Sequence, residues 1–185
     1  MNYEERIQRA VYLFKNGYNC AQAVTAAFAD IYGLTEDQAF RVAASFGAGI
    51  GRLRETCGAA SGMFILAGLD CGSPTAGDKT QKEINYKVVR HLATLFRERN
   101  GSLICGELLG LRPRVTVQTN SKQPVVETVA PSTLLEQSAP STLLEQSAPL
   151  AEYCKKRPCV IMVQEGARIF AEYLEEKNNY PEKLS

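Results

Sequence analysis

The sequence lacks an excess of charge of either sign, and this absence limits the partners it can have. Its 185 residues include 21 Lys and Arg against 20 Asp and Glu, a formal net charge of +1. This balance produces no overall field that would attract nucleic acid or an anionic membrane. The longest basic run, Lys-Lys-Arg at 155–157, is too short to follow a phosphate backbone. We therefore expect no nucleic-acid function.

Long apolar runs are also missing. The longest stretches, near 59–69 and 160–163, are shorter than the roughly 20 residues that a membrane-spanning helix requires. Residues 1–6 do not show the basic segment followed by an apolar one that marks a secretory signal. We expect no membrane insertion and a cytoplasmic location.

Several common catalytic and cofactor motifs are absent. With a single histidine, the chain has neither an H-E-x-x-H zinc motif nor a C-x-x-C-H haem attachment site. It contains no C-x-x-C pair and no G-x-S-x-G nucleophile turn. The glycines at 47, 49 and 51 lack the spacing of a dinucleotide-binding loop and follow a predicted helix, so we interpret them as a turn.

Helical periodicity dominates the sequence outside residues 112–151. Apolar residues recur at helical spacing, capping residues such as Asn19 and Thr35 mark helix starts, and glycines mark helix ends. The pattern predicts one domain over residues 1–185, an all-α bundle of about six helices. The six longer predicted helices are 3–14, 19–30, 35–46, 57–69, 78–99 and a last one from about 158, and a short helix at 102–110 accompanies them.

The helical pattern fails in residues 112–151, which we interpret as a long irregular insertion before the last helix. It contains an identical tandem nine-residue repeat, A-P-S-T-L-L-E-Q-S, at 130–138 and 139–147. Two short copies are too few for a solenoid, so a duplicated surface loop is the favoured interpretation. A partner-docking arm that uses the paired leucines as anchors is the alternative.

Six cysteines are the most informative feature of the chain. In a reducing compartment they would not form a structural disulfide framework. Four of them fall in the first turn of a predicted helix, where unpaired backbone N–H groups favour a thiolate and are expected to lower the pKa of the thiol. These four are Cys20, Cys57, Cys105 and Cys159, and the other two are Cys71 and Cys154. The repeated position favours a chemical role for the four over simple core packing.

The segment 57–62, Cys-Gly-Ala-Ala-Ser-Gly, begins the fourth predicted helix. The small residues Gly58, Ala59 and Gly62 would let a second backbone or a bulky cofactor approach the start of this helix closely. Tight packing between helices is the other interpretation of the same residues.

In these residues the chain resembles the redox-active C-GCAxxG-C-C family, whose hallmark is a CGAxxG segment with one cysteine upstream and two downstream. Cys20 matches the upstream cysteine, and Cys105 and Cys159 match the downstream pair, although Cys154 competes with Cys159 for the last position. The resemblance implies a compact helical domain with four functional cysteines, and an association with transporter genes. It covers nearly the whole chain except 112–151; the insertion, Cys71 and Cys154 depart from the pattern.

Three chemistries are open to four such cysteines. They could ligate an iron–sulfur cluster for electron transfer, exchange disulfides without a cofactor, or hold a structural zinc ion. We favour the cluster narrowly over the dithiol, with zinc third. A metal- or partner-binding adaptor is a further alternative. The redox partner protein is not identified by the sequence, and both a monomer and a homodimer are compatible with it.

Overall fold

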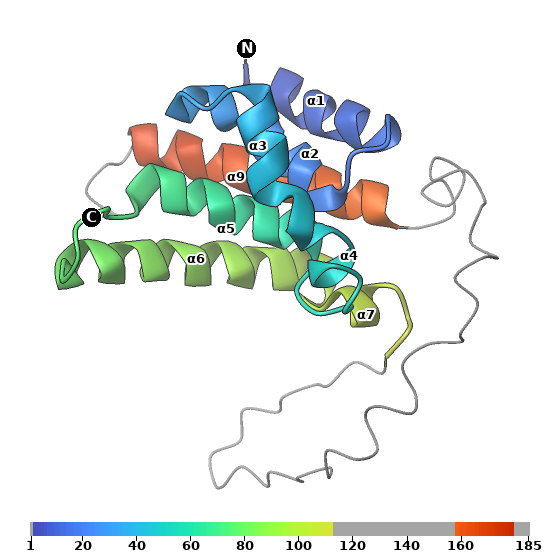
Figure 1. Ribbon diagram of the computed structural model, residues 1–185. Coiled ribbons are helices and arrows are strands. Elements are labelled where there is room, and N and C mark those ends of the chain that lie inside the picture. Colours follow the sequence, from blue (N-terminus) through green and yellow to red (C-terminus); the bar gives the residue numbers. More distant parts are fainter. Residues whose placement is uncertain (1, 113–157, 180–185) are drawn as a thin grey trace, which may run out of the picture.

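Helices form every regular element of the described chain, which comprises residues 2–112 and 158–179 of a computed structural model (Figure 1). In these ranges the only strand-like pairing is a single antiparallel bridge between Thr56 and Ile104. The predicted all-α fold is therefore confirmed. No helix in the described ranges combines the length and apolar character needed to cross a membrane.

The first three α-helices begin at capping boxes, in which a side chain and a backbone N–H group pair reciprocally across the first turn. Asn19, as predicted, caps the second helix, and Thr35 caps the third. The second helix ends earlier than predicted and continues as a 3₁₀ turn, since Phe28 leaves the helical conformation. The elements are α1 (Tyr3–Lys15), α2 (Cys20–Ala26), η1 (Ala29–Tyr32), α3 (Glu36–Ala43) and η2 (Ala44–Phe46).

Helix α5 (Gly58–Cys71) occupies the centre of the bundle, where it packs against α2, α6 (Lys79–Asn100) and α9 (Cys159–Asn179). It is buried on more than one side because most of its residues are small or apolar. Two glycines allow its neighbours to come close. A Cβ atom at Gly62 would lie 2.9 Å from the Cβ of Val24, and one at Gly166 would lie 3.2 Å from the carbonyl oxygen of Ala59.

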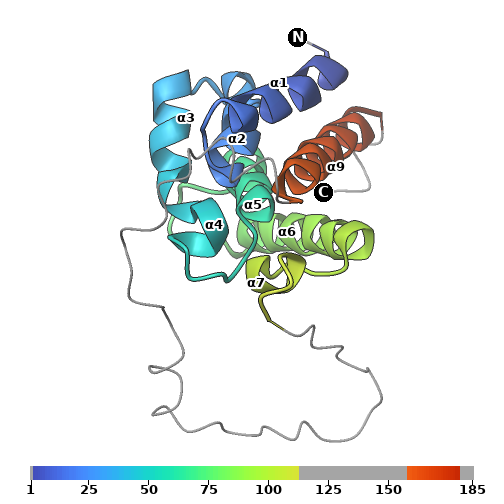
Figure 2. The same cartoon turned by 90° about the vertical axis from the view of Figure 1, so that its right-hand side faces the viewer.

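The direction of the helices brings several of their starting residues to one end of the bundle. Helices α5 and α9 both begin at the right-hand end in Figure 1, close to α4 (Gly47–Ile50) and α7 (Cys105–Leu108). Figure 2 looks onto this end. The short helix α7 begins three residues later than predicted, because the hydroxyl of Ser102 accepts the N–H of Ile104 and holds that residue outside the helix.

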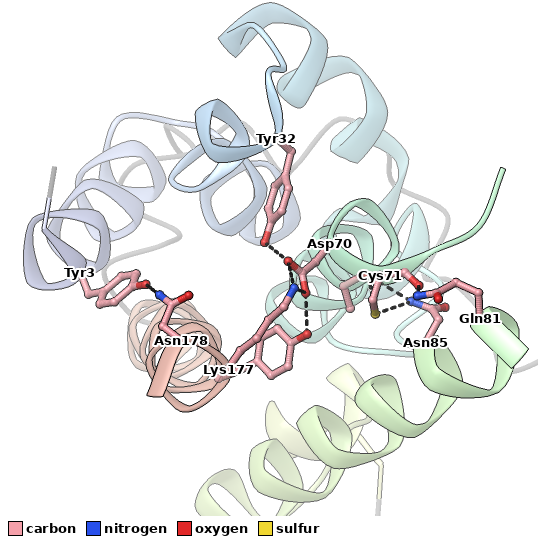
Figure 3. Close-up of polar contacts among 10 residues, drawn as sticks. Tyr3, Tyr32, Asp70, Cys71, Gln81, Asn85, Lys177 and Asn178 are labelled. Carbon is pink, nitrogen blue, oxygen red and sulfur yellow. Dashed lines mark hydrogen bonds and ion pairs between the residues drawn. The ribbon is translucent and has the colours of Figure 1, made fainter. Parts of the chain in front are cut away.

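A buried carboxylate holds the opposite end together (Figure 3). Asp70, whose side chain is 7% exposed, accepts two bonds from Lys177 Nζ at 2.9 and 2.8 Å. It also accepts the hydroxyls of Tyr173 at 2.5 Å and Tyr32 at 3.2 Å. Burial, together with the nearby carboxylate, raises the pKa of both tyrosines, so they remain donors. The Asp70 side chain thereby connects α9 and η1 to α5. We call Asp70 and its partners Tyr32, Tyr173 and Lys177 the Asp70 clasp.

We expect Asp70→Asn to lower the free energy of unfolding by about 2 kcal/mol, because the substitution leaves a partly buried ammonium group without its counter-charge. Urea denaturation measures this change. Glu83→Gln removes an exposed partner of Arg90 on α6 and should stay within about 0.5 kcal/mol of the wild type. Equal effects of the two substitutions would show that Asp70 does not act as a buried clasp.

The insertion predicted for 112–151 lies, apart from Arg112, outside the described residues, as do its tandem repeat and Cys154. The domain assignment and the interpretations of the repeat therefore stay predictions.

Candidate functional site

Four cysteines begin four different helices, as the sequence predicted. Cys20, Cys105 and Cys159 are the first residues of α2, α7 and α9, and Cys57 is the N-cap residue of α5. Three of them are buried, with exposed fractions of 8% for Cys20, 5% for Cys57 and 6% for Cys105, whereas Cys159 is half-buried. The four side chains therefore differ in their access to solvent.

The four cysteines lie together, and the electrostatics of Cys20 shows this. A hydrogen bond between the Cys20 thiol and the Cys159 sulfur is the largest cause that raises the pKa of Cys20, followed by burial. The charges of Cys57, Cys159 and Cys105, if ionised, raise the pKa further. Each of the other three is thus close enough to Cys20 to disfavour a second negative charge. A negative charge on any of these three cysteines therefore disfavours ionisation of the Cys20 thiol.

The expected lowering of thiol pKa values at helix N-termini is wrong for Cys20 and Cys57. Burial raises the pKa of Cys57 to about 12, although the backbone N–H groups of Ala59 and Ala60 act in the opposite direction. Charges on Cys105 and Cys159 add to the increase. Desolvation outweighs the helix terminus because these sulfurs are shielded from water. At neutral pH the thiols of Cys20 and Cys57 are therefore neutral.

We expect Cys57 in the folded chain at pH 8 to react with iodoacetamide at least roughly 30-fold more slowly than in the urea-unfolded chain. Its smaller thiolate fraction is only partly offset by higher nucleophilicity, and burial slows the reaction further. Mass spectrometry of the Cys57 peptide gives the rate. The raised pKa of Cys57 also contributes to the free energy of unfolding. This contribution is fully present below pH 9 and is lost as the pH rises toward 12. Similar rates in folded and unfolded chains would contradict the assignment.

Glycines create the space in which the cysteines meet. A Cβ atom at Gly58 would lie 3.0 Å from the Cβ of Cys20, and one at Gly49 would lie 2.6 Å from the Cβ of Cys105. The close approach predicted for Gly58, Ala59 and Gly62 is made by α2 and α9. Their predicted role in binding a cofactor stays a prediction.

The segment that connects η2 to α5 has a conformation that the sequence analysis did not foresee. Residues 48–52 have consecutive positive φ angles, so α4, predicted as a flexible turn, continues into a left-handed turn. Three of these residues, Ala48, Ile50 and Arg52, are not glycine, and Arg54 also has a positive φ of 65°. Each such residue costs roughly 1 kcal/mol or more. The alternating glycines at 49 and 51 were the available signal, since glycine adopts this conformation freely.

Backbone hydrogen bonds hold this left-handed segment against the cysteines. The N–H of Cys105 donates to the carbonyl of Glu55 at 2.6 Å, and the N–H of Gly106 donates to that of Arg54 at 2.9 Å. The N–H of Cys57 donates to the carbonyl of Leu103 at 2.7 Å. Backbone hydrogen bonds between residues 54–57 and 103–106 therefore position both Cys57 and Cys105. The strained left-handed turn directly precedes this bonded segment.

Cys71 does not belong to the site. It is the last residue of α5, separated from Cys57 by about 20 Å of helix. Its thiol donates to the carbonyl of Ala67 at 3.2 Å, and its sulfur accepts from the Asn85 amide at 3.4 Å (Figure 3). These contacts explain Cys71 as a packed core residue near the Asp70 clasp. That clasp was missed by the sequence analysis; its signal was one acidic residue in an otherwise uncharged apolar helix.

The donor chemistry of the four cysteines suits a metal centre, but their arrangement does not. Four thiolates are sufficient for zinc or an iron–sulfur cluster. Within residues 2–112 and 158–179, however, no group of three or more His, Cys, Asp or Glu side chains is arranged to hold a metal ion. The sulfurs are neighbours without forming a coordination shell.

Comparison with known proteins gives one match. The model of a family described as "Putative redox-active protein (C_GCAxxG_C_C)" matches residues 18–173, a range that includes all four cysteines of the site. No curated protein and no solved structure matches the chain.

Proposed function

The chain belongs to the C_GCAxxG_C_C family, and from this premise we propose that its cysteines exchange electrons by reversible dithiol–disulfide chemistry. Cys20 and Cys159 form the working pair, and Cys57 and Cys105 complete their surroundings. The observation that carries the proposal is the hydrogen bond between the thiol of Cys20 and the sulfur of Cys159. Two cysteine sulfurs within hydrogen-bonding reach can form a bond when both lose a proton and together lose two electrons.

The difference in exposure supports Cys159 as the cysteine that reacts first with the partner. It is half-buried, whereas Cys20 is 8% exposed. The Cys20 thiol keeps its proton and shares it with the Cys159 sulfur, which supports negative charge on Cys159. The start of α9 acts in the same direction, since Cys159 is its first residue and lies at the positive end of its dipole.

The exchange proceeds in two balanced steps. The Cys159 thiolate attacks one sulfur of a partner disulfide, which forms a mixed disulfide and releases the other partner sulfur as a thiolate. Cys20 then loses its proton and attacks the Cys159 sulfur. The bond to the partner breaks, the Cys20–Cys159 bond forms, and the second partner sulfur leaves. The pair has lost two electrons and the partner disulfide has gained them. The reverse sequence reduces the pair.

A redox titration tests this proposal. The folded protein is equilibrated with glutathione buffers of graded potential, quenched with acid, unfolded and alkylated, and its thiols are counted by mass. We expect a reversible loss of two thiols, with a tenfold change in the oxidised-to-reduced ratio for about every 30 mV. Cys71→Ser should leave this transition unchanged. A chain that stays folded and loses no thiols reversibly would exclude the dithiol function.

A metal centre on the same residues is the second candidate function. It is favoured by the number of sulfurs that influence Cys20, since three further cysteines surround it. Because the present arrangement forms no coordination shell, binding would require the side chains to turn. A spectrum of the anaerobically purified protein tests this candidate. Absorption bands between about 320 and 450 nm would support iron–sulfur ligation, and stoichiometric zinc in a colourless sample would support a structural metal site.

A further inference from the structure

The left-handed segment presents an unusual surface to solvent. Leu53 is 63% exposed and stands between Arg52 and Arg54. Neither arginine side chain forms an ion pair or hydrogen bond with another residue of the described chain, in contrast to Arg112 nearby, which pairs with Glu55 at 3.1 Å. An exposed apolar side chain between two uncompensated cations is therefore fixed beside the cysteine site.

This surface is pre-formed. Arg52 and Arg54 have φ angles of 72° and 65°, which L-residues rarely adopt without support. The support comes from both sides of Leu53. Its N–H donates to the carbonyl of Ile50 at 3.0 Å, and its carbonyl accepts from Arg112 at 3.1 Å. A surface held in this way loses little conformational freedom when it binds.

A second exposed leucine extends the apolar area. Leu111 is 58% exposed and directly precedes Arg112, whose guanidinium reaches the carbonyl of Leu53. Ile50, which is 37% exposed, belongs to the left-handed turn of residues 48–52. We define the Arg–Leu surface as Ile50, Arg52, Leu53, Arg54 and Leu111.

Two carboxylates of residues 2–112 close to this surface are already engaged. Glu55 pairs with Arg112, and Glu107 accepts the hydroxyl of Ser102 at 2.5 Å. Among the described residues, the charge left without a partner on the Arg–Leu surface is therefore positive. Guanidinium groups pair with carboxylates through two parallel hydrogen bonds, and arginine is enriched where interfaces contribute most to binding.

We propose that the Arg–Leu surface docks an acidic segment of the protein with which the cysteine site exchanges electrons. This inference rests on the proposed dithiol function. Carboxylates of the partner pair with Arg52 and Arg54, and an apolar side chain covers Leu53. The same backbone that forms the surface bonds to Cys105 through the Glu55 carbonyl, so a segment bound there lies next to one of the four cysteines of the site.

Three synthetic disulfide peptides serve as probes. Each contains the same central disulfide and one leucine, flanked by glutamates, lysines or serines. The reduced protein is mixed with each peptide, and its rate of oxidation is followed at low salt and at 0.5 M salt. We expect the acidic peptide to react about tenfold faster than the serine peptide at low salt and the basic peptide to react more slowly. Salt should reduce these differences, because it screens exposed charges.

Matched charge reversals locate the effect. Arg52→Glu combined with Arg54→Glu should reverse the order of the acidic and basic peptides. Lys79→Glu combined with Lys82→Glu changes the net charge equally at the start of α6, where both lysines are exposed, and should keep the order. The comparison of the three peptides uses the wild-type protein, so its result does not depend on whether either variant folds.

The outcomes distinguish failure of the docking surface from failure of the dithiol function. Equal rates for acidic and basic peptides in the wild type, with the serine peptide still oxidising the protein, would overturn the docking surface and leave the dithiol function standing. The same applies if the α6 control changes the order as much as the loop variant does. If none of the three peptides oxidises the folded protein, the dithiol function itself fails.

Discussion

Replacing Cys159 by serine is expected to abolish oxidation of the site by a disulfide, whereas replacing Cys20 by serine is expected to stop the reaction halfway. The reason is the order of attack. Cys159 is the half-buried member of the pair and makes the first bond to the partner, while the buried Cys20 resolves it. Without Cys20 the mixed disulfide on Cys159 has no neighbouring thiol of the pair to displace the partner.

Intact-mass measurements of the mixed disulfide follow this difference directly. In Cys20→Ser we expect the adduct on Cys159 to persist roughly 100-fold longer than in the wild type, because a thiol held in contact acts at a high effective concentration. In Cys159→Ser no adduct on Cys20 should accumulate. Cys71→Ser is the control, since Cys71 lies at the other end of α5. An adduct that resolves equally fast with and without Cys20 would show that another thiol is the resolving group.

The substitution Gly49→Ala is expected to have the largest effect on stability, about 3 kcal/mol or more. A Cβ atom at this position would lie 2.6 Å from the Cβ of Cys105 and 2.9 Å from the backbone of Arg54. Gly49 also has a positive φ of 74°, which disfavours any L-residue. The collision involves backbone on one side and a cysteine of the site on the other, so relief of the contact must displace Cys105 or the left-handed turn.

Gly51→Ala separates the collision from the backbone conformation. Gly51 lies in the same turn with a φ of 56°, but the nearest atom to its added Cβ is 4.0 Å away. This control should therefore cost only about 1 kcal/mol. Urea denaturation measures both variants, and alkylation of Cys105 reports the local displacement. If both substitutions cost the same, contact with Cys105 is not what requires glycine at position 49.

The helix starts could be predicted because their signals are local. Asn19 and Thr35 cap the helices that they were expected to cap, and Pro158 precedes α9. A cysteine that follows such a residue is placed in the first turn by the chain itself. The positions of Cys20 and Cys159 on their helices therefore followed from the sequence, whereas Cys105 became the first residue of α7 only because that helix begins later than predicted.

The electrostatics of the site could not be predicted in the same way. A helix start lowers the pKa of a thiol, whereas burial raises it, and only the packed structure shows that burial dominates at Cys57. The left-handed turn was missed for a related reason. Three non-glycine residues in residues 48–52 adopt a conformation that their local preferences oppose, and long-range hydrogen bonds to residues 103–106 hold the adjoining strand-like segment. The Asp70 clasp likewise joins residues more than 100 positions apart.

Mapping the disulfide that forms when the folded, reduced protein is oxidised with one equivalent of diamide tests the central claim most directly. The account predicts that digestion without reduction yields a peptide pair that joins Cys20 to Cys159, with Cys71 recovered as a thiol. Oxidation that leaves these two cysteines unlinked while the chain stays folded, with bonds formed only elsewhere or none formed at all, would contradict it.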